Sequence, residues 1–322
     1  MHILYDEGLN IDFGLLNYLH PFDGCKFRKV RRMLADLPSA SFQTPPPALE
    51  LARLQAHMGA RHAAQCTQKE YILRALELPA LPLPFSWIDR KILLPMRRAC
   101  AATLYAAQGA LQGQSYWNLA GGYHHASALN SEGFCVYNDI YTALQELRGA
   151  GSLGQQQRVL LIDVDAHHGN GNAEAFETDR SVFILDQFNS QIYPYGERSR
   201  QRLDLAVPLR SGVDGGDYLR ALDQALAQLP AQHASRPFAL AFVIAGSDVL
   251  ESDPLGGMAL TIQDCIAREE RIWRCLHCMQ VPAVWLGGGG YGKQSAQTIA
   301  GALRALYRLE QEVAGARSLE RL

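Results

Sequence analysis

The sequence lacks a basic surplus, long apolar runs and an apolar leader. Its 322 residues include 30 Lys and Arg against 32 Asp and Glu, a net charge of −2. Proteins that bind nucleic acid usually carry a basic excess, so we expect no direct contact with DNA or RNA. No stretch reaches the about 18 uncharged apolar residues of a transmembrane helix. The charged start, MHILYDEGLN, has no secretory signal core, so we expect neither leader nor membrane span.

The cysteines do not suggest a disulfide framework. There are seven, an odd number, at scattered positions. This pattern suits a reducing compartment, and we expect a cytoplasmic protein. Cys275 and Cys278 have CxxC spacing, but no second pair accompanies them, which disfavours a zinc or redox role. Without internal repeats or low-complexity segments, residues 1–322 are expected to form one domain. The oligomeric state stays open, a homo-oligomer included.

Short apolar runs that end in small or acidic residues predict buried strands. They are Val159–Ile162, Val182–Leu185, Leu240–Ile244 and Pro282–Leu286. Helical patterns lie between or after them, at Tyr218–Gln228, Thr261–Cys278 and Ser295–Val313. The alternation predicts an α/β fold with a central, mainly parallel sheet and helices on both faces. Sites in such folds form beyond the carboxyl ends of the strands.

Acidic and imidazole side chains follow two of these strands. Asp163 and Asp165 share one face of the chain, and His167 follows in the turn. Buried carboxylates are costly unless they are paired or bind a cation. The alternative to metal binding, for a single Asp, is a carboxylate that caps the next helix. Asp248 follows another predicted strand and is either a turn residue or a third metal ligand. As a third ligand it would complete a set of two carboxylates and one imidazole, which suits a catalytic zinc ion.

Two further segments carry candidate chemistry. The adjacent His124 and His125 are either a buried core pair or proton-transfer groups beside a metal. The glycine run Gly287–Gly290 is either a flexible loop or a backbone that approaches a ligand closely, with Gly289 as a substrate contact. In the second case the run presents Tyr291, whose phenol is a donor for a developing oxyanion.

Together the motifs resemble the histone deacetylase family of zinc amidohydrolases, which has the arginase–deacetylase fold. Five motifs occur in the family's order: GGYHH, GFCVYND, DVDAHHGNG, GSDVLESDPLG and GGGGY. The resemblance covers most of the chain, and the combination is far more specific than any single motif. Three features are similar to the class IV branch: LHPFDGCKFRKV at residues 19–30, IYP at 192–194, and Asn170 where other branches usually have Asp.

The resemblance implies roles for individual residues. The implied zinc ligands are Asp165, His167 and Asp248, with His125 as general base and His124 as its electrostatic or proton-donating neighbour. Asp163 is implied to orient His124 and to bind a structural potassium ion. Tyr291 is implied to polarise the scissile carbonyl. The acyl channel is implied to be lined by Gly133, Phe134 and Tyr193.

Two positions depart from related patterns. The arginase branch binds two manganese ions and needs an Asp where this chain has Gly169, which favours a single metal ion. Asn170 can orient His125 but brings no negative charge, so we expect His125 to be less readily protonated than in branches with Asp.

The expected function is removal of acetyl or longer fatty acyl groups from the lysine side chains of proteins or peptides. The alternatives are hydrolysis of small acylated amines such as acetylpolyamines, and a weakly catalytic module that binds acyl ligands. Zinc is the expected metal, and potassium is a second, structural candidate.

Overall fold

One parallel sheet organises the protein. The computed structural model describes residues 1–12, 22–79 and 82–319, and its described strands follow the order β2-β1-β3-β8-β7-β4-β5-β6. Every neighbouring pair is parallel. The strands are β1 (His2–Leu4), β2 (Phe42–Gln43), β3 (Tyr116–Asn118), β4 (Arg158–Asp163), β5 (Val182–Asn189), β6 (Leu205–Leu209), β7 (Phe238–Ile244) and β8 (Ala283–Leu286).

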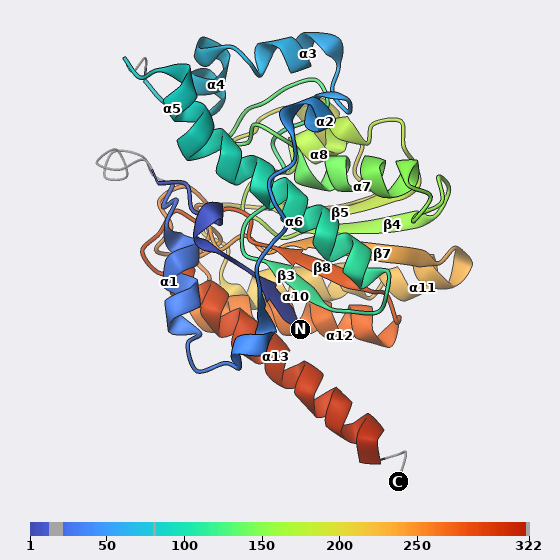
Figure 1. The fold of residues 1–322 in the computed structure, drawn as a ribbon. Helices are drawn as coiled ribbons and strands as arrows, with labels where there is room; N and C mark the ends of the chain where they lie inside the picture. Colours follow the sequence, from blue (N-terminus) through green and yellow to red (C-terminus); the bar gives the residue numbers. More distant parts are fainter. Residues whose placement is uncertain (13–21, 80–81, 320–322) are drawn as a thin grey trace.

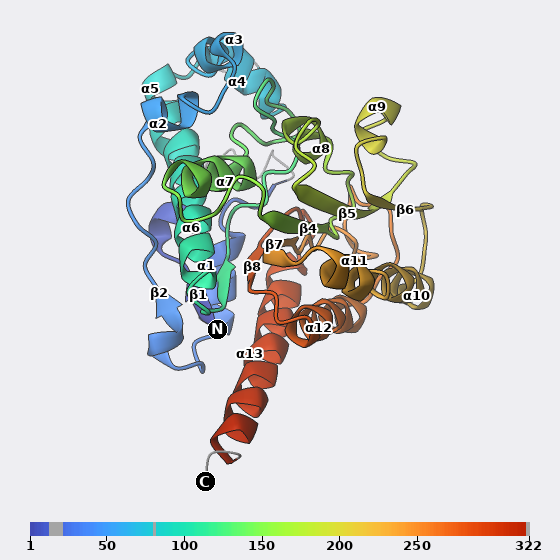
Figure 2. The same ribbon diagram turned by 90° about the vertical axis from the view of Figure 1, so that its right-hand side faces the viewer.

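Helices lie on both faces of this sheet (Figures 1 and 2). They are α1 (Lys26–Met33), α2 (Leu51–Gln55), α3 (Ala60–Gln65), α4 (Lys69–Ala75), α5 (Phe85–Ile88), α6 (Leu94–Ala110), α7 (Asp139–Gly149), α8 (Asn170–Ala175), α9 (Glu197–Arg200), α10 (Gly215–Leu226), α11 (Leu229–Ser235), α12 (Ile262–Cys278) and α13 (Ser295–Leu319). Short turns η1 (Glu7–Leu9) and η3 (Ser39–Ser41) are 3-10, and η4 (Asp89–Leu93) is π-helical.

The central strands are buried on both faces because their successive side chains enter two different cores. In β4, Val159 and Leu161 pack with residues of α6 and α7, whereas Leu160 and Ile162 pack with residues of α12 and α13. Side chains alternate across a strand, so a strand between two helical layers needs an apolar residue at nearly every position. This explains why the apolar runs of the sequence are continuous.

The predicted α/β class and parallel sheet are confirmed, with small shifts at the element ends. The four predicted strands lie in β4, β5, β7 and β8, although β8 begins one residue after Pro282. Thr261 is the N-cap of α12, where it forms a capping box with Asp264, rather than its first helical residue. All described strands join one sheet, and the single-domain assignment of residues 1–322 stays a prediction.

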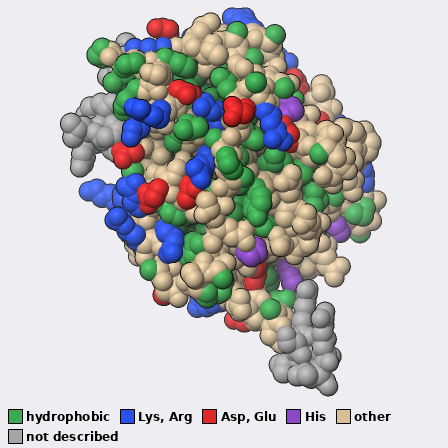
Figure 3. Space-filling view, in the orientation of Figure 1, with side chains coloured by type: hydrophobic (Ala, Val, Ile, Leu, Met, Phe, Trp, Pro, Cys, Tyr) green, Lys and Arg blue, Asp and Glu red, His purple; other side chains and the backbone are tan. Residues whose placement is uncertain are grey.

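The visible surface mixes both charge signs (Figure 3). Basic residues of α1 pair with acidic neighbours: Arg28 with Glu7, and Lys29 with Asp23. Within the described ranges, the helices are too short or too polar to cross a bilayer.

The sheet order explains where chemistry gathers. Strands β3, β8, β7 and β4 are consecutive neighbours, so the loops after their carboxyl ends lie side by side. These loops carry, in the same order, the His pair, the glycine run, Asp248 and the Asp163–His167 segment. Residues far apart in the sequence are therefore brought to one edge of the sheet.

Candidate active site

The three predicted metal ligands form one buried cluster. One ligand atom from each of Asp165, His167 and Asp248 lies within 4.8 Å of the others. His167 Nδ1 faces both carboxylates, 2.9 Å from Asp248 Oδ2 and 3.2 Å from Asp165 Oδ1. Backbone N–H groups hold the acids: Gly289 N donates to Asp165 Oδ2 at 2.7 Å, and Ala166 N donates to Asp248 Oδ1 at 3.0 Å.

The donor set fits one zinc ion. Zinc binds carboxylate oxygens and imidazole nitrogens, and a catalytic zinc site has three protein ligands and one open position, which this set can provide. Glycines create the space: a Cβ at Gly289 would run into the carboxylates of Asp248 and Asp165. A Cβ at Gly169 would lie 2.5 Å from Asp163 Oδ2, so this position has no room even for alanine. The Asp that a second metal would need therefore does not fit without displacing Asp163.

Charge within the cluster favours a bound cation. Burial works against protonation of His167, but the hydrogen bonds and charges of Asp165 and Asp248 raise its pKa to about 10. Burial, and then repulsion from Asp165, raise the pKa of Asp248 to about 7. Without a metal, a proton on His167 occupies the position between the carboxylates that the metal would take.

Zinc affinity is therefore expected to rise with pH. Below a pKa of about 10 the metal must displace the His167 proton, so affinity should increase about tenfold per pH unit. Below about pH 7 Asp248 also binds a proton, so zinc must displace two protons. The zinc affinity should then increase about a hundredfold per pH unit. Chelator-competition titrations across this range would measure the slope. An affinity that does not change with pH would contradict the proposed ligand set.

The two histidines of the GGYHH motif are buried and differently partnered. His124 Nδ1 lies 2.9 Å from Asp163 Oδ2, and His125 Nδ1 lies 2.7 Å from Asn170 Oδ1. Despite burial, the charges of Asp163 and Asp165 raise the pKa of His124 to about 9. Burial, reinforced by the neighbouring histidines, lowers the pKa of His125 well below its usual range. The pair thus combines a charged imidazole with a neutral one that can accept a proton.

Asp163 and Asp186 fit the predicted potassium ion. Burial raises the pKa of Asp163 to about 6, and the nearby Asp186 adds to that rise. Asp186 is fully buried, and its Oδ1 has no hydrogen-bond partner among the described residues. An unpaired buried carboxylate oxygen is costly, and a monovalent cation would satisfy it. Asp186, which directly follows the predicted strand Val182–Leu185, was not among the residues expected at the site.

His168 lies outside the metal cluster, in agreement with its omission from the predicted ligands. Its Nδ1 is 2.7 Å from Asp186 Oδ2, and its Nε2 is 2.9 Å from Ser199 Oγ. Both ring nitrogens therefore have partners, and the residue ties the turn after β4 to β5 and α9.

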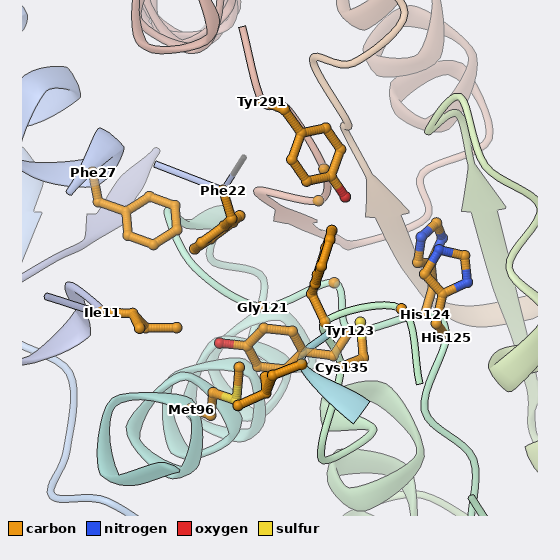
Figure 4. A pocket seen from close by; sticks show the side chains of 16 residues that line it. Ile11, Phe22, Phe27, Met96, Gly121, Tyr123, His124, His125, Cys135 and Tyr291 are labelled. Carbon is orange, nitrogen blue, oxygen red and sulfur yellow. The ribbon is translucent and has the colours of Figure 1, made fainter. Parts of the chain in front are cut away.

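Tyr291 projects from the glycine run into the pocket beside the His pair (Figure 4). Its ring lies edge-on to His167, with centroids 6.1 Å apart. Burial, and then the charges of Asp248 and Asp165, raise the pKa of the phenol well above its usual range. The hydroxyl therefore stays protonated near neutral pH, as a hydrogen-bond donor must.

Lys26 is a site residue that the sequence reasoning missed. It is fully buried, and its ammonium donates to the carbonyls of Gly288 and Gly289 at 3.1 and 3.2 Å. These hydrogen bonds hold the backbone that carries Tyr291. Lys26 belongs to the segment 19–30 that favoured class IV, of which residues 19–21 lie outside the described residues. A lysine inside an otherwise apolar helical face was the available signal.

Gly133 and Tyr193 pack against His125, and Phe134 packs against Tyr291. Their role as the lining of an acyl channel stays a prediction. The ring of Tyr193 is 5.1 Å from that of His125, and the ring of Phe134 is 5.8 Å from that of Tyr291. Gly133 and Phe134 both adopt positive φ, 55° and 64°. The Phe134 N–H donates to Ala75 O at 3.0 Å, which anchors this bend to the end of α4.

Alanine at Gly133 is expected to lower kcat by up to about a hundredfold, because misplacing a reacting group by about 1 Å has this effect. The new Cβ would lie 2.5 Å from His125 Cδ2, so the ring must move. Gly151→Ala is the matched control, since it also has positive φ, 71°, but nothing within 4 Å. Both variants should lose stability, and only Gly133→Ala should lose turnover in steady-state assays. Equal activity of the two would contradict the close packing.

The pocket continues past the His pair into an apolar space (Figure 4). About 40 Å³ of this space is wide enough for a water-sized group, so the pocket is narrow. Side chains from distant segments line the inner part: Ile11, Phe22, Phe27, Leu76, Met96 and Tyr123. Phe22 and Phe27 lie in the segment 19–30 and Tyr123 lies in GGYHH, but none of the six was expected to line a pocket, because each resembles an ordinary core residue.

Comparison with known proteins shows which family the chain and its fold resemble. The profile of the histone deacetylase domain matches residues 51–306. Histone deacetylase 2 of Arabidopsis thaliana is 33% identical over 316 residues, which cover 95% of this chain and 78% of that protein. Histone deacetylase 1 of Homo sapiens is 34% identical over 182 residues, which cover 54% of this chain and 35% of that protein. The crystal structure of the HDA15 HD domain aligns with a TM-score of 0.73 and 20% identity, over 96% of this chain and 90% of that one, a likeness of fold.

Proposed function

Because the chain belongs to the histone deacetylase family, we propose that it is a zinc-dependent hydrolase that removes acyl groups from lysine side chains of proteins or peptides. The observation that carries the proposal is a pocket lined by the neutral His125 and the phenol of Tyr291, both of which contact His167 of the buried Asp-His-Asp cluster. A protein that only binds acyl ligands would need none of these groups.

Zinc held by Asp165, His167 and Asp248 would supply a Lewis acid that polarises the substrate carbonyl and acidifies water. His125 turns Nδ1 toward Asn170, so its Nε2 is the nitrogen left to take the proton of the attacking water. The Tyr291 hydroxyl donates a hydrogen bond to the carbonyl oxygen as negative charge develops there. His125, or its charged neighbour His124, then gives a proton to the leaving amine.

The pocket supports acyl groups longer than acetyl. Acetyl needs little room beyond the reacting carbonyl, whereas the space beside Ile11, Phe27 and Met96 is apolar and continuous with the site. Burying methylene groups there contributes roughly 0.8 kcal/mol each. We therefore place medium and long acyl-lysines beside acetyl-lysine as substrates.

Asn170 and Ile192–Pro194 support a class IV relationship, and the free thiols of all seven cysteines support a cytoplasmic location.

A substrate panel tests the proposal. The zinc-loaded protein would be assayed with acetyl-, octanoyl- and myristoyl-lysine peptides and with acetylputrescine. We expect turnover of the peptides, with higher kcat/KM for octanoyl than for acetyl. Turnover of acetylputrescine alone would assign the protein to small amines. Binding of all acyl peptides without turnover of any would leave the binding function.

A further inference from the structure

Glu132 stands behind Asn170, on the side away from His125. The Asn170 side chain bridges the two, because its Oδ1 lies 2.7 Å from His125 Nδ1 and its Nδ2 donates to Glu132 Oε1. The sequence indicated that Asn170 leaves His125 without a charged partner. The structure supplies a carboxylate one residue further out. We propose that Glu132 is a positioning residue that fixes the tautomer and orientation of His125 through Asn170, an inference that rests on the proposed function.

The donor and acceptor inventory sets the direction of this chain. A carboxylate only accepts hydrogen bonds, so the group that Asn170 turns toward Glu132 must be its amide NH₂. The amide oxygen is then left to face His125, and an oxygen only accepts. His125 must therefore carry its proton on Nδ1 and leave the Nε2 lone pair free. Without Glu132 the amide can turn over, present NH₂ to Nδ1, and favour the tautomer that is unable to act as base.

Glu132 is itself held in place. Asn130 Nδ2 donates to its Oε2 at 3.1 Å, and the Cys135 N–H donates to its backbone carbonyl at 2.9 Å. The next residue is Gly133, whose backbone packs against the His125 ring. Glu132 also raises the pKa of Tyr193, after the larger contribution of burial, and so lies near the channel wall. One short segment thus supplies the channel lining, the bend beside His125 and the carboxylate.

Other charged groups near this chain do not replace Glu132. Around His125 stand His124, His167 and Asp165, which act on the ring by charge. Glu174 lies near Glu132, but its side chain is exposed. Asn170 Oδ1 is the group that faces His125 Nδ1, and Glu132 is the one described acceptor for the Asn170 amide. The tautomer therefore depends on this single contact.

Four variants test the arrangement: Glu132→Ala, Glu132→Gln, Asn170→Asp and the double exchange Glu132→Gln with Asn170→Asp. Glu132→Ala should lower kcat about 10–100-fold, the usual effect of losing a group that orients a site residue, with KM and zinc content unchanged. Glu132→Gln keeps an acceptor oxygen and should stay within about threefold of wild type. Asn170→Asp places a second carboxylate next to that of Glu132, and the repulsion should lower activity. The double exchange should restore activity, because the side-chain amide introduced by Glu132→Gln can donate a hydrogen bond to the carboxylate introduced by Asn170→Asp.

Two readouts besides turnover separate positioning from a general structural role. Nitrogen-15 NMR of the His125 ring should show Nδ1 protonated in wild type and in Glu132→Gln, and a mixture of tautomers in Glu132→Ala. In the double exchange, the carboxylate introduced at position 170 contacts the His125 imidazole directly and should raise its pKa. The loss of activity on the acidic side of the pH–rate profile should therefore occur at higher pH than in wild type. Melting temperatures identify any variant that simply fails to fold.

Three results would overturn the inference: wild-type kcat in Glu132→Ala, an unchanged His125 tautomer in that variant, or a double exchange no more active than Asn170→Asp. The proposed function can fail separately. If the wild-type protein hydrolysed no acyl substrate, the NMR comparison alone would decide. A tautomer that depends on Glu132 would support the positioning role, and one that does not would end it.

Discussion

Replacing Asp248 by alanine is expected to lower zinc affinity by more than about a hundredfold and to abolish turnover. Losing an outer residue that orients a ligand already lowers affinity about 10–100-fold, and Asp248 is a ligand itself. Its two oxygens have separate tasks: Oδ2 faces His167 Nδ1, and Oδ1 accepts from the Ala166 N–H. The substitution removes half of the negative charge of the cluster and also frees the turn that carries His167.

Metal analysis after dialysis and thermal unfolding with added zinc would measure this loss. A ligand that binds only the folded state raises its stability by mass action, so zinc should raise the melting temperature of wild type but not of Asp248→Ala. Asp223→Ala is the matched control, since it removes an exposed carboxylate paired with Arg271. Surface pairs contribute little, so that variant should bind zinc normally. Full zinc content in Asp248→Ala would refute the ligand assignment.

The residues of the Asp-His-Asp cluster could be predicted because their signal is local. Asp165 lies two residues after the end of β4 and Asp248 four residues after the end of β7, and a carboxylate buried there is costly unless it is paired or binds a cation. The parallel sheet then brings such strand ends together whatever their separation in sequence. The sequence did not predict β1, β2, β3 and β6. The first three have only two or three residues, which is shorter than any periodic pattern.

The supporting residues could not be predicted, because their roles arise only in the folded chain. Lys26 acts on glycine carbonyls more than 260 positions away, and nothing in its own segment names that partner. From the sequence, Glu132 resembles a solvent-exposed acidic residue of a loop, and its role depends on the hydrogen bond from Asn170 that the structure shows. Gly169 was interpreted through the carboxylate that it lacks, whereas the structure shows that Asp163 leaves no room for one. Candidate ligands can be recognised in the sequence by their residue type, whereas supporting residues are recognised only by their contacts in the folded structure.

Replacing Tyr291 by phenylalanine is expected to lower kcat about 10²–10³-fold while zinc content stays at the wild-type level. A single donor to a developing oxyanion has this effect when it acts in a buried site. The ring itself is held by aromatic neighbours, with centroids 5.8 Å from Phe134 and 6.4 Å from Phe22, so phenylalanine should keep its position. The loss is then assigned to one hydroxyl rather than to packing.

Tyr123→Phe provides the matched control within the same pocket. Its hydroxyl points away from the His pair, toward the apolar part of the cavity (Figure 4). Removing it should therefore leave kcat within about threefold of wild type and, by making the cavity more apolar, should favour the longer acyl chains. Because the Tyr291 hydroxyl contributes mainly when charge develops, KM should change far less than kcat in Tyr291→Phe. A large rise in KM with unchanged kcat would instead assign Tyr291 to substrate binding and remove it from the chemical step.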